Sequence, residues 1–325
     1  MDTFTTFAED WFVLSLLFGA ALLIFGGQML VDGGITIAKH LNVSLLIIGL
    51  TVVAFSTSAP ELALNIIAVM NGNGELALGN IFGSNIANIG LVLGIGALIC
   101  KLPVTGHIVS WEFPFLMVAT LIVSVITFLN PELTMIWSLA FLFLFCIAMF
   151  HWYKQGKSGT SILAAESKEL VAGDSRSAIA GVCLLALGLV LLGLGGKLTE
   201  IGAVTFATKI GISQLVIGVT IVAIATSLPE VVTVVIAARK GHPDLAVGNV
   251  VGSNLFNMLF VLPISLFVGK ITVPSDIWIY LSAMCAITFI AFLFKNGKRF
   301  NPVEGGVLLS LYAIFLIALV IWKSA

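Results

Sequence analysis

The sequence reads LIIGLTVVAFSTSAPELALNIIAVMNGNGELALGNIFGSNIANIG at residues 46–90 and LVIGVTIVAIATSLPEVVTVVIAARKGHPDLAVGNVVGSNLFNML at residues 215–259. The two stretches align without a gap at a constant offset of 169 residues, and about half of the 45 aligned positions are identical. The identities include a glutamate that follows a proline and a set of glycines and asparagines, so apolar composition alone does not explain them. The chain therefore contains two copies of one unit.

The composition of the chain assigns it to the membrane. Of its 325 residues, 59% are hydrophobic and 10% are charged, which is too little charge for a soluble protein of this length. A membrane-spanning helix needs about 20 mostly apolar residues. This criterion predicts ten spans, at 11–31, 42–70, 75–99, 110–129, 132–153, 178–197, 211–238, 244–269, 275–295 and 302–322.

The predicted spans form two groups of five. We predict a first five-helix repeat at 1–153, a linker at 154–177 and a second five-helix repeat at 178–325. Because five is an odd number, the second copy must enter the membrane from the opposite side. The expected fold is an all-α membrane protein with ten transmembrane helices in two inverted repeats. The predicted loops on the linker side hold eleven Lys and Arg residues against four on the other side, which predicts a cytoplasmic linker and both termini outside.

Each repeat places a glutamate near the middle of a long apolar span, in the motifs TSAPE and TSLPE. A buried carboxylate is costly unless something compensates its charge, and no Lys or Arg lies at matching depth in any predicted span. Proline removes a backbone donor and disturbs the preceding helical turn, so Pro60 and Pro229 are expected to free carbonyl groups around residues 54–56 and 223–225. We therefore expect Glu61 and Glu230 to bind a cation or a proton.

A second motif follows in each copy, GNIFGSN at 79–85 and GNVVGSN at 248–254. Its glycines let helices approach closely, and its serines and asparagines add hydroxyl and amide oxygens. With the two glutamates, the repeats offer only oxygen ligands, which suit hard cations such as Ca²⁺ and Na⁺ rather than zinc, copper or iron. Two carboxylates balance one Ca²⁺ or about two Na⁺.

These motifs resemble those of the calcium:cation antiporter family, which includes the sodium/calcium exchangers and their bacterial relatives. The two family repeats look like TSxPE followed by GNxxGSN. The resemblance implies that Glu61 and Glu230 are the central Ca²⁺ ligands. It implies that hydroxyl or carbonyl groups complete their site, at Thr57, Thr226, Ser58 and Ser227. It also implies flanking Na⁺ positions, lined by the carbonyls of Ala54 and Ala223 with Ser84 and Ser253.

The asparagines of the second motif set a limit on this resemblance. Asn85 is a ligand by the same resemblance, whereas Asn254 is a departure, because some family members have Asp at one of these two positions. An Asn there removes a third carboxylate. The Na⁺ stoichiometry and any K⁺ co-transport therefore stay open.

The leading hypothesis is secondary active antiport of Ca²⁺ against Na⁺ across the cell inner (plasma) membrane, by alternating access around ions bound between the repeats. Two alternatives stay open: H⁺ as the counter-ion, and a passive cation channel. No nucleophile and base occur in an arrangement typical of an enzyme. We expect no cofactor, and as partners only inorganic cations and the lipid bilayer, with no nucleic acid and no obligatory protein partner.

Overall fold

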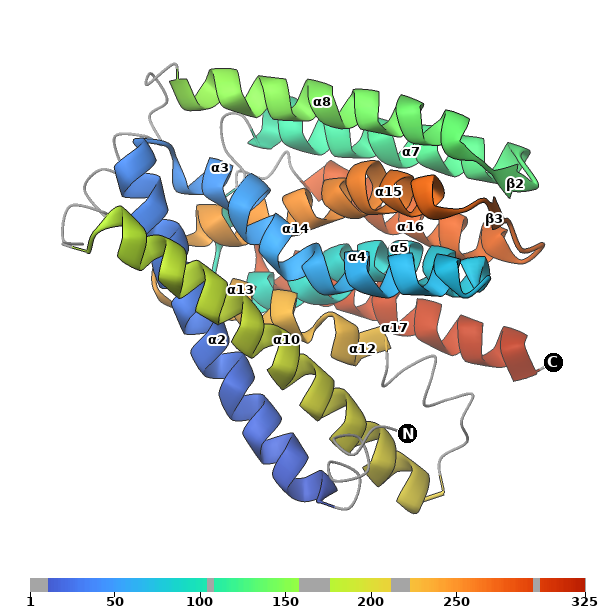
Figure 1. The fold of residues 1–325 in the computed structure, drawn as a ribbon, viewed down its shortest axis with the longest axis horizontal. Helices are drawn as coiled ribbons and strands as arrows, with labels where there is room; N and C mark the ends of the chain where they lie inside the picture. Colours follow the sequence, from blue (N-terminus) through green and yellow to red (C-terminus); the bar gives the residue numbers. More distant parts are fainter. Residues whose placement is uncertain (1–10, 104–107, 158–175, 212–222, 295–298, 325) are drawn as a thin grey trace.

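The computed structural model describes residues 11–103, 108–157, 176–211, 223–294 and 299–324 (Figure 1). Within these residues, nine helical segments are long and apolar enough to cross a membrane. The remaining predicted span, 211–238, includes residues 212–222, which lie outside the described residues. The nine segments are Phe12–Leu41, Leu45–Met70, Gly74–Ile99, Ser110–Leu129, Met135–Gln155, Ala178–Lys209, Pro243–Val268, Ile277–Phe294 and Pro302–Trp322.

Several spans are built from shorter helical elements, because π-helical turns (η) interrupt the α-helix. In the first half the elements are α2 (Phe12–Leu41), α3 (Leu45–Ile48), η1 (Gly49–Val53), α4 (Ala54–Met70), α5 (Gly74–Ala87), η2 (Asn88–Leu93), α6 (Gly94–Ile99), β1 (Leu102–Pro103), η3 (Ile108–Glu112), α7 (Phe113–Leu129), β2 (Glu132–Leu133) and α8 (Met135–Lys157).

In the second half the elements are α10 (Ala178–Lys209), α12 (Ala223–Thr226), α13 (Leu228–Arg239), α14 (Pro243–Phe256), η5 (Asn257–Val261), α15 (Leu262–Val268), β3 (Ile271–Thr272), α16 (Ile277–Phe294), β4 (Arg299–Phe300) and α17 (Pro302–Ser324). The offset of 169 relates local features of the two halves. The π-helical turns η2 and η5 begin at Asn88 and Asn257. The turns before α5 and α14 contain Gly72 and Gly241, whose φ angles are +73° and +80°.

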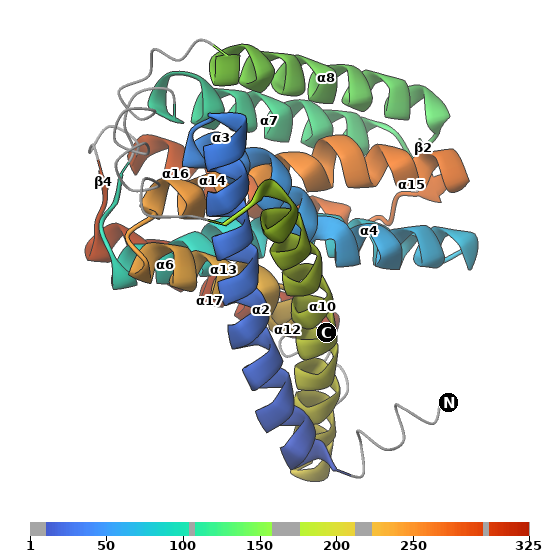
Figure 2. The same cartoon turned by 60° about the vertical axis from the view of Figure 1, so that its left-hand side comes forward.

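Two short antiparallel β-ladders confirm that the halves are inverted. β1 pairs with β4, and β2 pairs with β3. α7 runs from β1 to β2 and α16 runs from β3 to β4, so the two ladders lie at opposite ends of the bundle, as Figure 2 shows for β4 and β2. Each ladder therefore joins a loop of one repeat to a loop of the other.

α2 and α10 lie side by side and are inclined to the other helices (Figures 1 and 2). Glycines at spacings of seven make this antiparallel contact close. A Cβ atom added at Gly26 would lie 3.0 Å from the Gly188 carbonyl oxygen, and one added at Gly19 would lie 2.9 Å from that of Gly195. Close backbone approach through small residues is typical of helix pairs in membranes.

α2 and α10 are longer than the spans predicted at 11–31 and 178–197. They contain 30 and 32 residues, which corresponds to about 45–48 Å at 1.5 Å per residue. The sequence criterion ended both spans at the first polar residues, although the helices continue past them. α8 also extends beyond the predicted boundary at 153, and residues 158–175 of the predicted linker lie outside the described residues.

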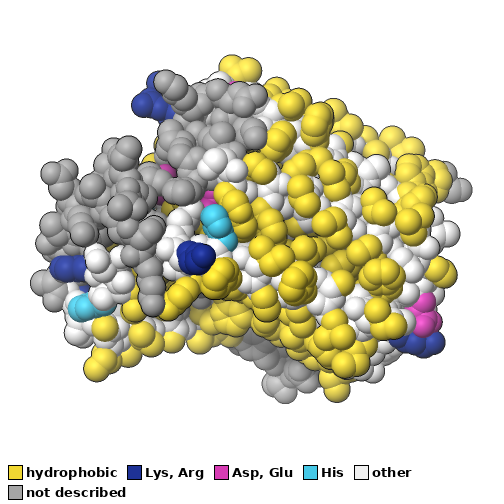
Figure 3. Space-filling view, turned by 90° about the horizontal axis from the view of Figure 1, so that it is seen from above, with side chains coloured by type: hydrophobic (Ala, Val, Ile, Leu, Met, Phe, Trp, Pro, Cys, Tyr) yellow, Lys and Arg dark blue, Asp and Glu magenta, His cyan; other side chains and the backbone are white. Residues whose placement is uncertain are grey.

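The outer surface of the bundle is hydrophobic. Seen from the side of α7 and α8, apolar side chains cover most of the face, and charged side chains lie toward its ends (Figure 3). On α8, Ile136, Phe143 and Phe150 are all more than half exposed. A broad apolar belt of this kind matches the hydrocarbon layer of a bilayer, so the structure agrees with the membrane class that composition predicts.

Candidate functional site

Three of the four motifs lie on the most deeply buried of the described spans, and the fourth, TSLPE, lies on α12 and α13. Of the nine described spans, Pro243–Val268, Gly74–Ile99 and Leu45–Met70 have the largest buried shares. α3, η1 and α4 pack directly against α14, because glycines stand at the contact. A Cβ added at Gly49 would lie 2.6 Å from the Leu245 carbonyl oxygen, and one added at Gly248 would lie 2.6 Å from that of Leu46. Substitution at this contact would force the helices apart.

Glu61 on α4 and Glu230 on α13 lie together inside this bundle. They are 4% and 1% exposed, and the cavity that Glu61 lines is also lined by Pro229, the residue before Glu230. Among the described residues, no hydrogen-bond donor reaches Oε2 of Glu61 or either carboxylate oxygen of Glu230, and neither residue forms an ion pair. Two buried carboxylates without a basic partner need a bound cation or protons to compensate them.

The two TSxPE motifs adopt different backbone structures. Pro60 lies inside the continuous helix α4, where it leaves the Ser56 carbonyl group without its helical donor. The matching proline, Pro229, lies at the start of α13, because the helix is interrupted at Ser227 between α12 and α13. The expected release of carbonyl groups near each proline therefore takes two forms: a single missing bond in the first repeat and a helix break in the second.

Hydrogen bonds around the two motif threonines also differ. The Thr57 hydroxyl lies 3.2 Å from Oδ1 of Asn249 and 3.2 Å from Oγ of Ser253, both on α14. At the offset of 169, the corresponding set is Thr226, Asn80 and Ser84. In the described residues no hydrogen bond joins Thr226 to Asn80 or Ser84.

Instead, Thr226, Asn80 and Ser84 line a cavity of about 450 Å³. The glycines of the second motif differ between the repeats in the same way, one tightly packed and the other facing open space. A Cβ added at Gly252 would lie 2.5 Å from the Leu50 carbonyl oxygen, whereas one added at Gly83 would meet no atom within 4 Å. Gly83 lines the cavity. Equivalent groups are thus packed together in one place and separated by open space in the other.

A second cavity of about 260 Å³ is lined by Glu61. Both cavities share lining residues, which are Leu64, Asn80, Lys197, Glu200 and Thr226. The larger cavity reaches Asn73 and Glu75, in and after the turn between α4 and α5. We call this end of the bundle the Asn73 face. The adjoining cavities connect it to the Glu61 carboxylate.

The other predicted site residues lie on the same helices as the glutamates or on the helices packed against them. Ser58 and Ser227 are buried, and their hydroxyl groups have no described hydrogen-bond partner. Asn85 and Asn254 each donate to the carbonyl group four residues earlier, at 3.0 and 2.8 Å. The remaining predicted residues are Ala54 at the start of α4, Ala223 at the start of α12, and the buried serines Ser84 and Ser253.

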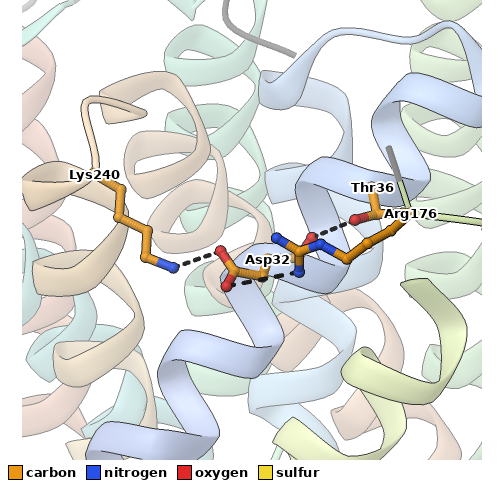
Figure 4. A network of polar contacts seen from close by, with 4 residues as sticks. All are labelled: Asp32, Thr36, Arg176 and Lys240. Carbon is orange, nitrogen blue, oxygen red and sulfur yellow. Dashed lines mark hydrogen bonds and ion pairs between the residues drawn. The ribbon is translucent and has the colours of Figure 1, made fainter. Parts of the chain in front are cut away.

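The opposite end of the bundle, which we call the Lys240 face, carries an ion-pair network (Figure 4). Lys240, which follows α13, lies 2.5 Å from Oδ1 of Asp32 on α2, and Arg176 lies 3.8 Å from Oδ2 of the same carboxylate. Asp32 was not predicted to take part in a network. Its partners are 208 and 144 positions away in the sequence, so no local pattern could have identified them.

Two further features of the site have a signal in the sequence. Lys197 and Glu200 line both cavities, and their spacing of three residues places them on one helix face. Asn88 and Asn257 begin the π-helical turns, and neither side chain has a described hydrogen-bond partner. π-Helical turns are frequent at functional sites, and both asparagines are identical between the repeats.

An all-α membrane fold of two inverted repeats, with two buried carboxylates at its centre, is that of a membrane transport protein. Residues 11–154 and 180–321 match the family described as Sodium/calcium exchanger protein. The chain belongs to this family.

Individual relatives support the same assignment. The chain is 36% identical over 302 residues to CaxA of Alkalimonas amylolytica, covering 90% of this chain and 94% of that protein. It is 48% identical over 86 residues to the sodium/calcium exchanger MaX1 of Methanosarcina acetivorans, covering 26% and 25% of the two chains. The structure of the sodium-calcium exchanger NCX_Mj soaked with 10 mM Na⁺ and zero Ca²⁺ matches with a TM-score of 0.80 and 29% identity, covering 94% of this chain and 98% of that chain.

Proposed function

We propose that this protein is a secondary active antiporter that exchanges Ca²⁺ for Na⁺. The observation that carries the proposal is the pair Glu61 and Glu230, both buried and without an ion pair among the described residues, with Glu61 lining a cavity that adjoins the one at the Asn73 face. Two carboxylates surrounded by hydroxyl and carbonyl oxygens suit hard cations. The names of the relatives MaX1 and NCX_Mj support these two ions.

In this proposal the ligands divide as follows. Glu61 and Glu230 bind Ca²⁺ directly, with oxygen atoms of Thr57, Thr226, Ser58 and Ser227 around them. The carbonyls of Ala54 and Ala223, with Ser84, Ser253, Asn85 and Asn254, serve Na⁺ positions beside the carboxylates. Because one Ca²⁺ and about two Na⁺ carry the same charge, the two carboxylates can bind either set of ions with little change in the net buried charge. Because Ca²⁺ and Na⁺ share these ligands, they cannot bind at the same time, and exchange is obligatory.

We further propose that the repeats exchange conformations during the cycle. The Thr57–Asn249–Ser253 contact and the close packing of Gly252 support this idea, because their counterparts in the first repeat, Thr226 and Gly83 among them, line a cavity. In the exchanged state, Thr226, Asn80 and Ser84 come together and the Asn73 face closes. Access to the glutamates then passes to the Lys240 face. Alternating access of this kind is typical of transporters with inverted repeats.

The excess of Lys and Arg on the linker side supports an orientation in the cell inner (plasma) membrane with the Lys240 face cytoplasmic and the Asn73 face outside. Both termini are then outside and the linker 154–177 is cytoplasmic. Impermeant thiol labelling of single cysteines placed at Asn73 and Lys240, in a background without native cysteines, tests this. Labelling of the Lys240 position from outside intact cells would contradict it.

A gradient exchange in proteoliposomes tests the proposed function. An outward Na⁺ gradient is expected to drive ⁴⁵Ca²⁺ uptake, whereas a pH gradient or a K⁺ gradient of the same size is not. Uptake driven by the pH gradient alone would instead make H⁺ the counter-ion. Uptake that follows only the membrane potential and the Ca²⁺ gradient would identify a passive cation channel and refute antiport.

A further inference from the structure

The ion pair between Lys197 and Glu200 lines both cavities on the Asn73 side of Glu61. Nζ of Lys197 lies 3.2 and 3.1 Å from the two carboxylate oxygens of Glu200, one turn further along α10. Both residues line the larger cavity and also the smaller one, which Glu61 lines as well. The Lys197 side chain is 56% exposed and that of Glu200 is 25% exposed. A fixed positive charge therefore stands in the same space as the carboxylate to which cations must travel.

Lys197 is unusual for a route that would carry cations. The other ionisable carboxylates that line the two cavities, at Glu61, Glu75 and Glu200, all attract cations. Among the described lining residues, Lys197 alone carries a positive charge. At the offset of 169 its counterpart in the first repeat is Gln28 (28 + 169 = 197), which is neutral. The repeat architecture therefore does not require a lysine at this position, and of the two repeats only the second has one there.

The valence of an ion determines how strongly such a charge affects it. A local electrostatic potential changes the concentration of an ion in the cavity by a Boltzmann factor. The exponent contains the charge of the ion, so a factor f for Na⁺ becomes f² for Ca²⁺. Lys197 therefore disfavours Ca²⁺ more than Na⁺, whereas Glu200 opposes this effect by pairing with the lysine.

We propose that the Lys197–Glu200 pair sets the balance between Na⁺ and Ca²⁺ on the Asn73 face, by fixing the electrostatic potential of the cavities that lead to Glu61. This inference rests on the proposed function. Lys197 touches no ion in this role. It is a specificity-determining residue that lowers Ca²⁺ occupancy on the face where, in the proposed orientation, Ca²⁺ must be released and Na⁺ must bind.

Substitutions that remove one charge at a time test the proposal. Lys197→Gln removes the positive charge, Glu200→Gln leaves the lysine unpaired, and Lys197→Arg keeps the charge. The Lys270–Glu132 pair, with Nζ 2.9 Å from the carboxylate, offers a matched control at the β2–β3 end of the bundle, because neither residue lines either of these two cavities. Lys270→Gln and Glu132→Gln therefore change the net charge equally without changing the cavities.

Two readouts are needed for each variant. Equilibrium binding of ⁴⁵Ca²⁺ to the purified full chain, with Na⁺ as competitor, gives the two half-saturating concentrations whether or not transport occurs. Na⁺-driven ⁴⁵Ca²⁺ uptake in proteoliposomes gives the turnover rate. Lys197→Gln is expected to lower the half-saturating Na⁺ concentration about twofold and that of Ca²⁺ about fourfold, with smaller changes at high ionic strength.

Glu200→Gln is expected to raise both concentrations, again with the larger change for Ca²⁺. Lys197→Arg, Lys270→Gln and Glu132→Gln are expected to match the wild type. Equal changes for both ions, no change in Lys197→Gln, or the same change in Lys270→Gln would overturn the inference. If Lys197→Gln changes the binding of the two ions in this valence pattern but the wild type shows no Na⁺-driven uptake, the proposed antiport fails while the electrostatic role of Lys197 stands.

Discussion

Gly83→Ala is expected to slow the transport cycle without disturbing the arrangement described here. A Cβ at residue 83 meets no atom within 4 Å, because Gly83 faces the larger cavity. In the exchanged state that we propose, Gly83 would take the position that Gly252 has now. There a Cβ would lie 2.5 Å from a carbonyl oxygen and 2.6 Å from another Cβ, as it would for Gly252 beside Leu50 and Ala54.

The size of the effect follows from that contact. Excess volume in a packed interior costs about 1–3 kcal/mol, and about 1.4 kcal/mol is a factor of ten in a population. Gly83→Ala should therefore reduce the exchanged state about 5- to 150-fold and slow Na⁺-driven ⁴⁵Ca²⁺ uptake to a similar extent. Gly252→Ala introduces the same clash in the present state, so it should favour the exchanged one.

The assay uses Leu64→Cys, which lines both cavities, in a background where the four native cysteines are replaced. An impermeant thiol reagent is expected to label this cysteine faster in Gly83→Ala and more slowly in Gly252→Ala, relative to the unsubstituted background. Wild-type turnover in Gly83→Ala would refute the exchange of conformations. So would labelling rates that move in the same direction in both variants.

Three smaller predictions concern other contacts. Asp32→Asn removes the ion pair with Lys240 and should shift the labelling of the Leu64→Cys probe less than about fivefold, because partly exposed ion pairs contribute about 0.2–1 kcal/mol; a tenfold shift would contradict this. Thr57→Val removes the hydrogen bond to Asn249 and should lower the free energy of unfolding of the purified protein by roughly 1 kcal/mol, which lowers its melting temperature. An unchanged melting temperature would count against the contact. Burial, with Lys240 nearby, lowers the pKa of His242 below its ordinary value of 6.5. As the pH drops below about 6.5, the unfolded chain therefore binds the proton more readily than the folded one, and the free energy of unfolding falls. The melting temperature of His242→Gln should fall less between pH 7 and pH 5 than that of the wild type, and equal decreases would contradict the assignment.

The sequence predicts the core of the fold because the repeat is strong. The identical motifs predict two copies, the odd number of spans in each copy predicts their inversion, and the two β-ladders confirm the inversion. Burial of Glu61 and Glu230 without a basic partner is also predictable, since proline and hydroxyl residues surround each in an apolar span. Both conclusions depend on residue type and spacing, which the sequence contains directly.

The differences between the repeats could not be predicted. TSAPE and TSLPE are nearly the same sequence, yet Pro60 lies within a continuous helix and Pro229 beside a break. The asymmetry lies in contacts between the repeats, such as those of Thr57 with Asn249 and Ser253, which local sequence does not contain. The length of α2 and α10 was also missed, although glycines at 19, 26 and 33 repeat at seven-residue intervals and indicate a long helix contact. Lys197 appeared to belong to a loop because the predicted span ended there.

The most direct test of the central claim is the initial rate of Na⁺-gradient-driven ⁴⁵Ca²⁺ uptake by Glu61→Gln and Glu230→Gln proteoliposomes. Glu132→Gln serves as the control, because it removes the same charge from a residue that is paired with Lys270 and lines neither cavity. If the two buried carboxylates bind the exchanged ions, each variant loses uptake to the background rate while Glu132→Gln keeps the wild-type rate. Uptake at the wild-type rate in either Glu61→Gln or Glu230→Gln would contradict the account.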